Sequence, residues 1–347
     1  MRVITRQALA GWLDALVRER TLIAPREEAG VLLYRPVESS AQVVWDYTRP
    51  ALSVKEAFFP ATEQLLIIEK TGQTIALRDT LPEGEQVIFG VRSCDAQGVR
   101  ALDALFVDTE PADPYYARRR AQTTLIGLAC RTMGPTCFCT SVGGAPGDAH
   151  CVDLMLTEVQ GPAAPADPLY AAEAVTAKGR ALLETLIMQD ADCAPYPPAR
   201  GDIYPLPPRD AWPARFGDEE WERLAERCLS CRICAYVCPT CRCFAVRDER
   251  LPAGDGHERF ERIRCWDSCA GENYRRIAGG HNPRPLKGQR LRNRFFCKFY
   301  YYPEQYGPVA CTGCGRCIDA CPVDVEITEV LARLAAVADA GAGGASS

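Results

Sequence analysis

Two cysteine runs decide the fold of this chain: Cys228-Leu-Ser-Cys-Arg-Ile-Cys-Ala-Tyr-Val-Cys238-Pro239 and Cys311-Thr-Gly-Cys-Gly-Arg-Cys-Ile-Asp-Ala-Cys321-Pro322. Both follow the spacing C-x2-C-x2-C-x3-C-P, which is typical of bacterial [4Fe–4S] sites, and in two-cluster chains the cysteine before proline ligates the other cluster. The runs therefore predict two clusters. One is expected on Cys228, Cys231, Cys234 and Cys321, and the other on Cys311, Cys314, Cys317 and Cys238.

Structural zinc and a disulfide framework are the alternatives for so many thiols. Zinc usually takes two separated cysteine or Cys/His pairs, whereas each run here has three cysteines before its Cys-Pro ending, and the chain has only 3 His. Disulfide frameworks belong to short secreted chains, but this chain has 347 residues and 19 cysteines. The pattern favours iron–sulfur ligation in a reducing compartment.

Composition narrows the class of protein further. With 47% hydrophobic and 24% charged residues the chain is typical of a globular protein, and its net charge of −5 argues against a nucleic-acid partner. The first twenty residues lack the pattern of a signal peptide, and no apolar run approaches the length of a membrane span. We expect a cytoplasmic protein that binds neither nucleic acid nor membrane.

The N-terminal residues 1–193 predict an α/β domain. Helical periodicity is found over 7–20 and 97–106, and a long helix is expected over 169–189. Short apolar runs predict strands at 30–34, 42–45, 65–68, 86–93, 124–130 and 151–156. Residues 194–213 contain seven prolines, which predicts a semi-rigid linker over 194–217.

The C-terminal residues 218–338 predict an α-helical ferredoxin domain. Seventy-two residues separate Cys238 from Cys311, too many for a compact ferredoxin whose halves follow each other directly. Helices are expected over 258–263, 272–277 and 325–338, and a disordered tail over 339–347.

Further cysteines follow two of the predicted strands. Cys94 and Cys130 come where strands end, and in a parallel sheet sites gather outside the carboxyl ends of the strands. Cys137 and Cys139 follow closely. We hypothesise that these four bind a third metal centre; the alternative is that they pack as small buried hydrophobic residues.

A second surplus set and a basic run lie in the C-terminal part. Cys241, Cys243, Cys265 and Cys269 either contribute to an extra cluster or pack around the predicted ones, and packing is favoured. The basic run comprises Arg284, Lys287, Arg290, Arg292, Arg294 and Lys298, interleaved with aromatic residues. Its cations are expected to offset the negative charge of thiolate-bound clusters or to dock a partner.

The chain resembles the iron–sulfur β subunit of cytoplasmic NiFe hydrogenases of the sulfhydrogenase type and the related A subunit of anaerobic sulfite reductase. The motifs that carry the resemblance span residues from about 50 to 325. They are Val54-Lys-Glu-Ala-Phe-Phe-Pro60, Gly90-Val-Arg-Ser-Cys-Asp95, Tyr115-Tyr-Ala-Arg-Arg-Arg120, Cys137-Phe-Cys139, Cys238-Pro-Thr-Cys-Arg-Cys243, Trp266-Asp-Ser-Cys269, Ala278-Gly-Gly-His-Asn-Pro-Arg284 and Cys311-Thr-Gly-Cys-Gly-Arg-Cys317. One departure is Cys297, where the resemblance leads us to expect His.

The resemblance implies a dicluster electron-transfer subunit beside a flavin-binding subunit that oxidises NAD(P)H. Its catalytic partner would be of the hydrogenase or the sulfite reductase type, and the sequence leaves that choice open. No acid–base pair or nucleophile stands out, so the chain is not expected to catalyse a reaction alone. A stand-alone ferredoxin-like carrier is the alternative function.

Overall fold

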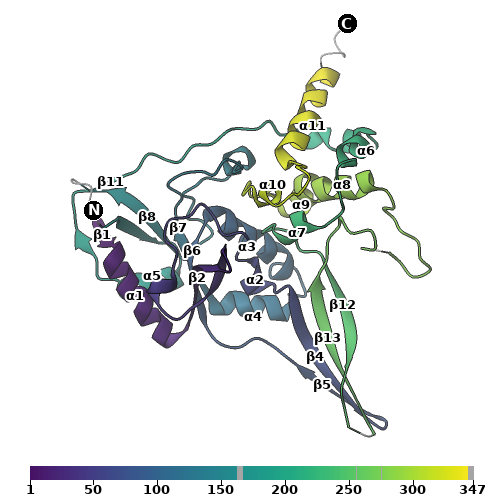
Figure 1. The fold of residues 1–347 in the computed structure, drawn as a ribbon, viewed down its shortest axis with the longest axis horizontal. Coiled ribbons are helices and arrows are strands. Elements are labelled where there is room, and N and C mark those ends of the chain that lie inside the picture. The colour runs from purple at the N-terminus through teal and green to yellow at the C-terminus, as the bar shows by residue number, and fades with distance from the viewer. Residues whose placement is uncertain (162–166, 255, 275, 343–347) are drawn as a thin grey trace.

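The computed structural model describes residues 1–161, 167–254, 256–274 and 276–342 and builds them around two sheets (Figure 1). In these residues the larger sheet has nine strands, in the order β10-β1-β9-β8-β7-β6-β2-β3, with β11 paired to β8. Their bounds are Arg2–Thr5 (β1), Thr21–Glu28 (β2), Val31–Val37 (β3), Gln86–Val91 (β6), Thr123–Leu128 (β7), Leu154–Gln160 (β8), Leu169–Ala174 (β9), Gln189–Asp190 (β10) and Ala194–Pro195 (β11). The smaller sheet has the order β12-β13-β4-β5, with strands Phe244–Leu251 (β12), His257–Trp266 (β13), Thr62–Thr71 (β4) and Thr74–Asp79 (β5).

Helices cover both faces of the larger sheet, and further helices lie in the cysteine-rich part. Those of the N-terminal part are Arg6–Glu19 (α1), Lys55–Phe58 (α2), Ser93–Phe106 (α3), Pro114–Gln122 (α4) and Ala177–Glu184 (α5). Those of the cysteine-rich part are Glu220–Ala225 (α6), Ile233–Tyr236 (α7), Lys287–Phe296 (α8), the π-helix Cys297–Tyr301 (η5), Tyr302–Tyr306 (α9), Arg316–Asp319 (α10) and Ile327–Ala342 (α11).

The larger sheet is mixed, with parallel pairing confined to its centre. Strands β2, β6, β7 and β8 pair in parallel, whereas the outer strands pair antiparallel. Along β6, Val87 and Phe89 enter the core under α1 and α5, and Ile88 enters the core under α3 and α4. Because successive side chains of a strand point to opposite faces, a short apolar run can fill both cores.

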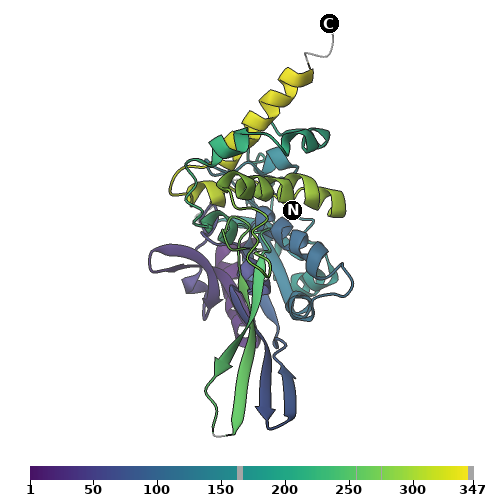
Figure 2. The same ribbon diagram turned by 90° about the vertical axis from the view of Figure 1, so that its right-hand side faces the viewer.

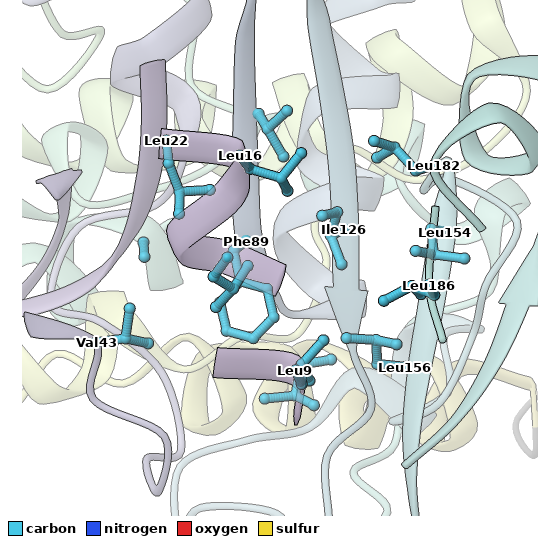
Figure 3. Packing of buried hydrophobic residues seen from close by; sticks show 14 of the residues in the cluster. Leu9, Leu16, Leu22, Val43, Phe89, Ile126, Leu154, Leu156, Leu182 and Leu186 are labelled. Atoms are coloured by element: carbon cyan, nitrogen blue, oxygen red, sulfur yellow. The ribbon is translucent and has the colours of Figure 1, made fainter. Parts of the chain in front are cut away.

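Figure 3 shows the first of these cores from close by. Leu9 and Leu16 of α1 and Leu182 of α5 pack around Phe89 and the neighbouring strands. Their side chains are at most 6% exposed. Burying a leucine contributes roughly 1.5–3 kcal/mol, so this layer holds β6 and β7, and with them the positions of Cys94 and Cys130, in a fixed frame.

The smaller sheet pairs strands from before the proline-rich segment with strands from after it. Strand β4 pairs antiparallel with β13, with Ile68 opposite Phe260 and Thr62 opposite Cys265. In Figures 1 and 2 the hairpins β4–β5 and β12–β13 project together as an arm, at the end opposite α11. The sheet is therefore built from segments on both sides of the expected linker.

The helix expected over residues 258–263 is wrong, because these residues belong to β13. The register of β13 against β4 shifts between Arg262 and Ile263. The extra residue there is Leu65 of β4, so β13 keeps its own alternation, and only the sequence spacing of Phe260 and Ile263 imitates a helical period. Pairing on both sides of the strand overrides this local pattern.

Other expected elements also differ from the structure. Residues 169–189 form β9 and α5 rather than one long helix, because the Thr176 side chain accepts a hydrogen bond from Gly179 N and starts a new helix there. Residues 42–45 are not a strand, and the strand expected at 151–156 begins only at Leu154. In place of the helix expected over 272–277, residues 272–274 form a turn, and 276–277 have no regular secondary structure; residue 275 lies outside the described part. Residues 343–347 of the expected tail also lie outside it, whereas 339–342 continue α11.

The proline-rich segment is fastened at both of its ends. Ala194 and Pro195 add to the larger sheet as β11. Trp212 is 1% exposed and stacks on Phe299, with ring centroids 5.7 Å apart. The segment is therefore anchored to the larger sheet at its start and to the aromatic residues of the cysteine-rich part near its end.

Candidate metal centre

The two cysteine runs adopt the same backbone geometry. The residues two and four positions after the first cysteine have positive φ in both runs: Ser230 (55°) and Arg232 (70°) in the first, Gly313 (61°) and Gly315 (75°) in the second. Each run then enters a short helix, α7 or α10, and these two helices lie in contact. Repeated left-handed residues curl the backbone so that its N–H groups and neighbouring side chains face one point.

The second run contains glycine at these positions because of a close approach by the N-terminal part. A Cβ on Gly313 would lie 2.5 Å from the backbone of Cys139, and one on Gly315 would lie 2.3 Å from the carbonyl oxygen of Thr136. Phe138 N donates a hydrogen bond of 2.7 Å to Gly313 O. The loop of residues 135–139 thus packs directly on the second cysteine run.

Gly313→Ala is expected to lower the free energy of unfolding by about 1–3 kcal/mol more than Gly143→Ala does, because overpacking against a backbone cannot be relieved by a side-chain movement. Gly143 is the matched control: its φ is 82° and an added Cβ would meet nothing within 4 Å. Chemical denaturation of both variants followed by circular dichroism checks this. Equal losses of stability would show that only the backbone conformation matters at Gly313.

The thiol of Cys238 lies near the start of the second run, because Lys298 Nζ contacts both Cys238 Sγ (3.2 Å) and the carbonyl oxygen of Ala310 (3.1 Å), the residue before Cys311. It interacts electrostatically with Cys311, Cys314 and Cys317, although seventy-two residues separate it from the first of them. Burial raises the pKa of Cys311 to about 12 and that of Cys317 to about 11. Iron is ligated by deprotonated thiolates, so positive charges near these sulfurs favour the form that binds iron.

The first run lies beside the second at α7 and α10. Cys234 interacts electrostatically with Cys317. Backbone N–H groups donate to two of the expected ligands, Ser230 N to Cys228 Sγ (3.4 Å) and Val325 N to Cys321 Sγ (3.2 Å). An ion pair of 2.9 Å between Arg227 and Glu329 joins the residue before Cys228 to α11, which follows Cys321.

Three cations of the basic run form a buried row on one face of α8 and η5. Arg290, Arg294 and Lys298 are four residues apart, one helical turn, and are 6%, 4% and 3% exposed. Arg290 Nη2 lies 3.5 Å from Ser230 Oγ in the first cysteine run. Lys298 Nζ donates to Cys238 Sγ at 3.2 Å and to Thr240 Oγ1 at 2.8 Å.

The surroundings of the Arg294 side chain indicate whether these residues fit a negatively charged cluster. Its Nε and Nη2 are buried and have no hydrogen-bond partner among the described residues. Burial would lower its pKa, but the electrostatic influence of Cys234, Cys317 and other cysteines holds that pKa well above its usual range. A buried guanidinium without a carboxylate is costly unless another anion compensates it. A thiolate-ligated iron–sulfur cluster would be such an anion, so the residues fit the group.

The spacing of the thiols also bears on the choice of metal. In the described part of the chain, no three side chains of His, Cys, Asp and Glu lie close enough together to hold one metal ion. The ligands of a [4Fe–4S] cluster are attached to four different irons and therefore lie farther apart than the ligands of one zinc ion. All nineteen cysteines are free thiols.

The structure brings the four cysteines of the hypothesised third centre together. Cys94 and Cys139 each interact electrostatically with Cys130, and Cys137 interacts with both Cys130 and Cys139. Arg49 Nη1 lies 2.9 Å from Cys137 Sγ. This group adjoins the second cysteine run, since Cys137 Sγ lies 3.9 Å from Cys314 O and Cys94 interacts electrostatically with Cys314, a ligand expected for the second cluster.

The four surplus cysteines of the C-terminal part do not all lie in one place in the structure. Cys265 lies on β13 with its Sγ 3.7 Å from Thr62 Oγ1, away from the others. Cys241, Cys243 and Cys269 line one cavity, and Cys297 completes that group. The hydrogen bond from Cys269 lowers the pKa of Cys243 to about 6. The sequence indicated no partner for Cys297, because only the packing of α8 and η5 brings it there.

Two buried contacts that the sequence did not reveal lock the cysteine runs to the N-terminal part. Arg316 of the second run forms a bidentate ion pair with Asp95, at 2.6 and 2.8 Å. Lys55 donates to the carbonyls of Tyr236 and Cys241, both at 3.3 Å. These contacts join residues that are more than 180 positions apart in the chain.

Comparisons with known proteins agree with this geometry. The family model described as a 4Fe-4S dicluster domain matches residues 227–325. Sulfhydrogenase 2 subunit beta of Pyrococcus furiosus is 32% identical over 305 residues, covering 86% of this chain and 87% of that protein. No solved structure gave a significant match. With this level of identity along most of both chains, and with the dicluster domain in place, the protein belongs to the sulfhydrogenase β-subunit family.

Proposed function

We propose that this chain is the electron-transfer subunit of a cytoplasmic oxidoreductase complex. It would relay single electrons between a flavin-containing subunit that oxidises NAD(P)H and a catalytic subunit of the NiFe hydrogenase or sulfite reductase type. The observation that carries the proposal is the assembly of both cysteine runs around the buried cations Arg294 and Lys298, which pair with no carboxylate among the described residues. The similarity to a sulfhydrogenase subunit favours the hydrogenase type. None of the described helices is long and apolar enough to cross a bilayer.

We assign the ligands as the spacing predicts. Cys228, Cys231, Cys234 and Cys321 would hold one [4Fe–4S] cluster, and Cys311, Cys314, Cys317 and Cys238 the other. The position of Cys238 among the thiols of the second run supports the exchange of the last cysteine between runs. In this assignment residues 218–338 form a helical ferredoxin domain into which the hairpin β12–β13 is inserted.

When bound, the clusters supply the one-electron redox chemistry, and the chain sets their potential and insulation. Lys298 and Arg294 place positive charge beside the sulfurs and so favour the reduced, more negative state. The backbone N–H groups of Ser230 and Val325 donate to ligand sulfurs and act in the same direction. The aromatic side chains of Trp221, Phe295 and Phe299, each at most 4% exposed, exclude water behind α8.

Cys94, Cys130, Cys137 and Cys139 remain the proposed ligands of a further metal centre. A test on an isolated fragment of residues 1–195 would remove β13, the partner of β4, so the full-length chain is the better material. Cys130→Ala is expected to lower the metal content of the full-length protein. An unchanged content of iron and zinc would favour simple packing of these thiols.

An anaerobic pull-down of the tagged protein from its own host tests the proposed function directly. Co-purification of a NiFe large subunit in stoichiometric amount, identified by mass spectrometry, would establish a hydrogenase complex. Recovery of a siroheme protein instead would establish the sulfite reductase type. If no stoichiometric partner came down, the complex would be refuted and a stand-alone carrier would take its place.

A further inference from the structure

A cavity of about 690 Å³ lies where the hairpin β12–β13 meets α8 and η5. Four cysteines line it: Cys241, Cys243, Cys269 and Cys297. They come from three separate segments, because Cys241 and Cys243 precede β12, Cys269 follows β13, and Cys297 is the first residue of η5. None of these four belongs to the two cysteine runs.

The hairpin fixes two of these thiols at its base. Phe244 of β12 is opposite Trp266 of β13, and Asp267 N donates to Cys243 O at 2.9 Å. Antiparallel pairing therefore brings the segment before β12 and the segment after β13 side by side. Cys243 and Cys269 come from these two segments and interact electrostatically in the same cavity.

The other two cysteines complete the group. Cys269 interacts electrostatically with both Cys241 and Cys297. The four thiols thus surround one space from three directions, as the ligands of a polynuclear cluster must. Residues 297–301 form a π-helix between α8 and α9, and π-helical turns appear frequently at functional sites.

The charge of the lining suits an anion. The lining includes four cations and one carboxylate: Arg242, Arg284, Arg294, Lys298 and Asp267. Asp267 is already paired with Arg232 at 3.3 Å. Arg242 Nη2 lies 3.6 Å from Cys297 Sγ, and the Nε and Nη2 atoms of Arg294 have no partner within the described ranges. Arg242 and Arg284 thus add positive charge to that of Arg294 and Lys298, which also lie near the proposed clusters of the two runs.

We propose that Cys241, Cys243, Cys269 and Cys297 ligate an additional [4Fe–4S] cluster in this cavity. A single zinc ion fits less well, since the space greatly exceeds one ion and no three ligands converge on one point in the part of the chain that the structure describes. Cys241 interacts electrostatically with Cys238, and Lys298, which lines the cavity, donates to Cys238 Sγ at 3.2 Å, so the new centre adjoins the second proposed cluster. The inference rests on the proposed function, because the centre would extend the same relay.

Iron and acid-labile sulfide in the full-length protein, purified or reconstituted anaerobically, test this assignment. Cys297→Ser and Cys269→Ala are each expected to lose about four irons and four sulfides relative to the wild type. Cys265→Ala is the matched control, because Cys265 lies at the end of the same hairpin but points toward Thr62; it should keep the full content. Serine nearly preserves the shape of Cys297, which is half-buried, so this variant is expected to fold even if Cys269→Ala does not.

The comparison with Cys234→Ala separates this inference from the proposed function. Cys234→Ala should lose about four irons because of its place in the first cluster. If it does, but Cys297→Ser and any folded Cys269→Ala keep wild-type iron, the additional cluster is refuted and the two-cluster relay stands. Loss of one zinc in place of iron refutes it equally. If Cys234→Ala also keeps all its iron, the proposed function fails.

Discussion

Cys238→Ala combined with Cys314→Ala is expected to remove about four irons per chain, no more than either substitution alone, whereas Cys238→Ala combined with Cys234→Ala should remove about eight. The reason is the exchange of the last cysteine between runs. Cys238 follows Cys234 in the same run, yet its thiol interacts electrostatically with all three thiols that begin the second run, Cys311, Cys314 and Cys317. Two ligands of one cluster give a non-additive loss, and ligands of different clusters give an additive one.

Iron per chain and the electron paramagnetic resonance of the reduced proteins measure this outcome. Each single variant should also stop electron flow to the partner subunits, since a relay fails when one step is missing. Cys193→Ala is the control, because Cys193 lies between β10 and β11, outside both cysteine runs. Lys298 keeps Thr240 and Ala310 as acceptors when Cys238 is replaced, so the fold should survive. The reverse pattern, additive with Cys314 and non-additive with Cys234, would assign Cys238 to the first cluster.

Arg316→Met is expected to lower the free energy of unfolding by about 3–5 kcal/mol, because it leaves the carboxylate of Asp95 buried without its cationic partner. The two side chains are 2% and 0% exposed. After the substitution, Asp95 would keep the hydroxyl of Tyr34, 3.3 Å away. Arg316 Nε also donates to Pro50 O at 2.8 Å, a bond that methionine cannot replace.

Chemical denaturation at matched iron content checks this value. Arg333→Met is the control, because Arg333 is 56% exposed in its ion pair with Glu329, and such pairs contribute only about 0.3–0.5 kcal/mol. Replacing both Arg316 and Asp95 by apolar residues should recover part of the loss, since no unpaired charge then remains. A loss below 1 kcal/mol in Arg316→Met would show that water reaches Asp95.

Local patterns explain which elements could be predicted. The helix over residues 7–20 and the strands at 65–68, 86–93 and 124–130 were expected with correct type, because their periodicity reflects burial on a face or between two layers. At 258–263 the three-residue spacing of Phe260 and Ile263 imitates a helical period, and only the pairing of β13 with β4 and β12 decides the conformation.

The surplus cysteines show the same limit at the level of the site. Spacing distinguished the eight cysteines of the two runs, but it grouped Cys265 with Cys241, Cys243 and Cys269. In the structure the alternation of β13 turns Cys265 toward Thr62, and Cys297 takes its place in the group. No spacing rule relates Cys297 to residues that precede it by 28 or more positions.

The sequence by itself identified the two cysteine runs as ligand loops, because cysteines that bind a cluster from one short loop must have the spacing that the geometry of the loop requires. It also determined the apolar strands that frame them. The tertiary structure decided which distant groups meet: Cys238 with the second run, Arg316 with Asp95, and the loop of residues 135–139 with Gly313. These contacts depend on how sheets and helices pack, and packing brings together residues whose separation along the chain carries no pattern that could be read in advance.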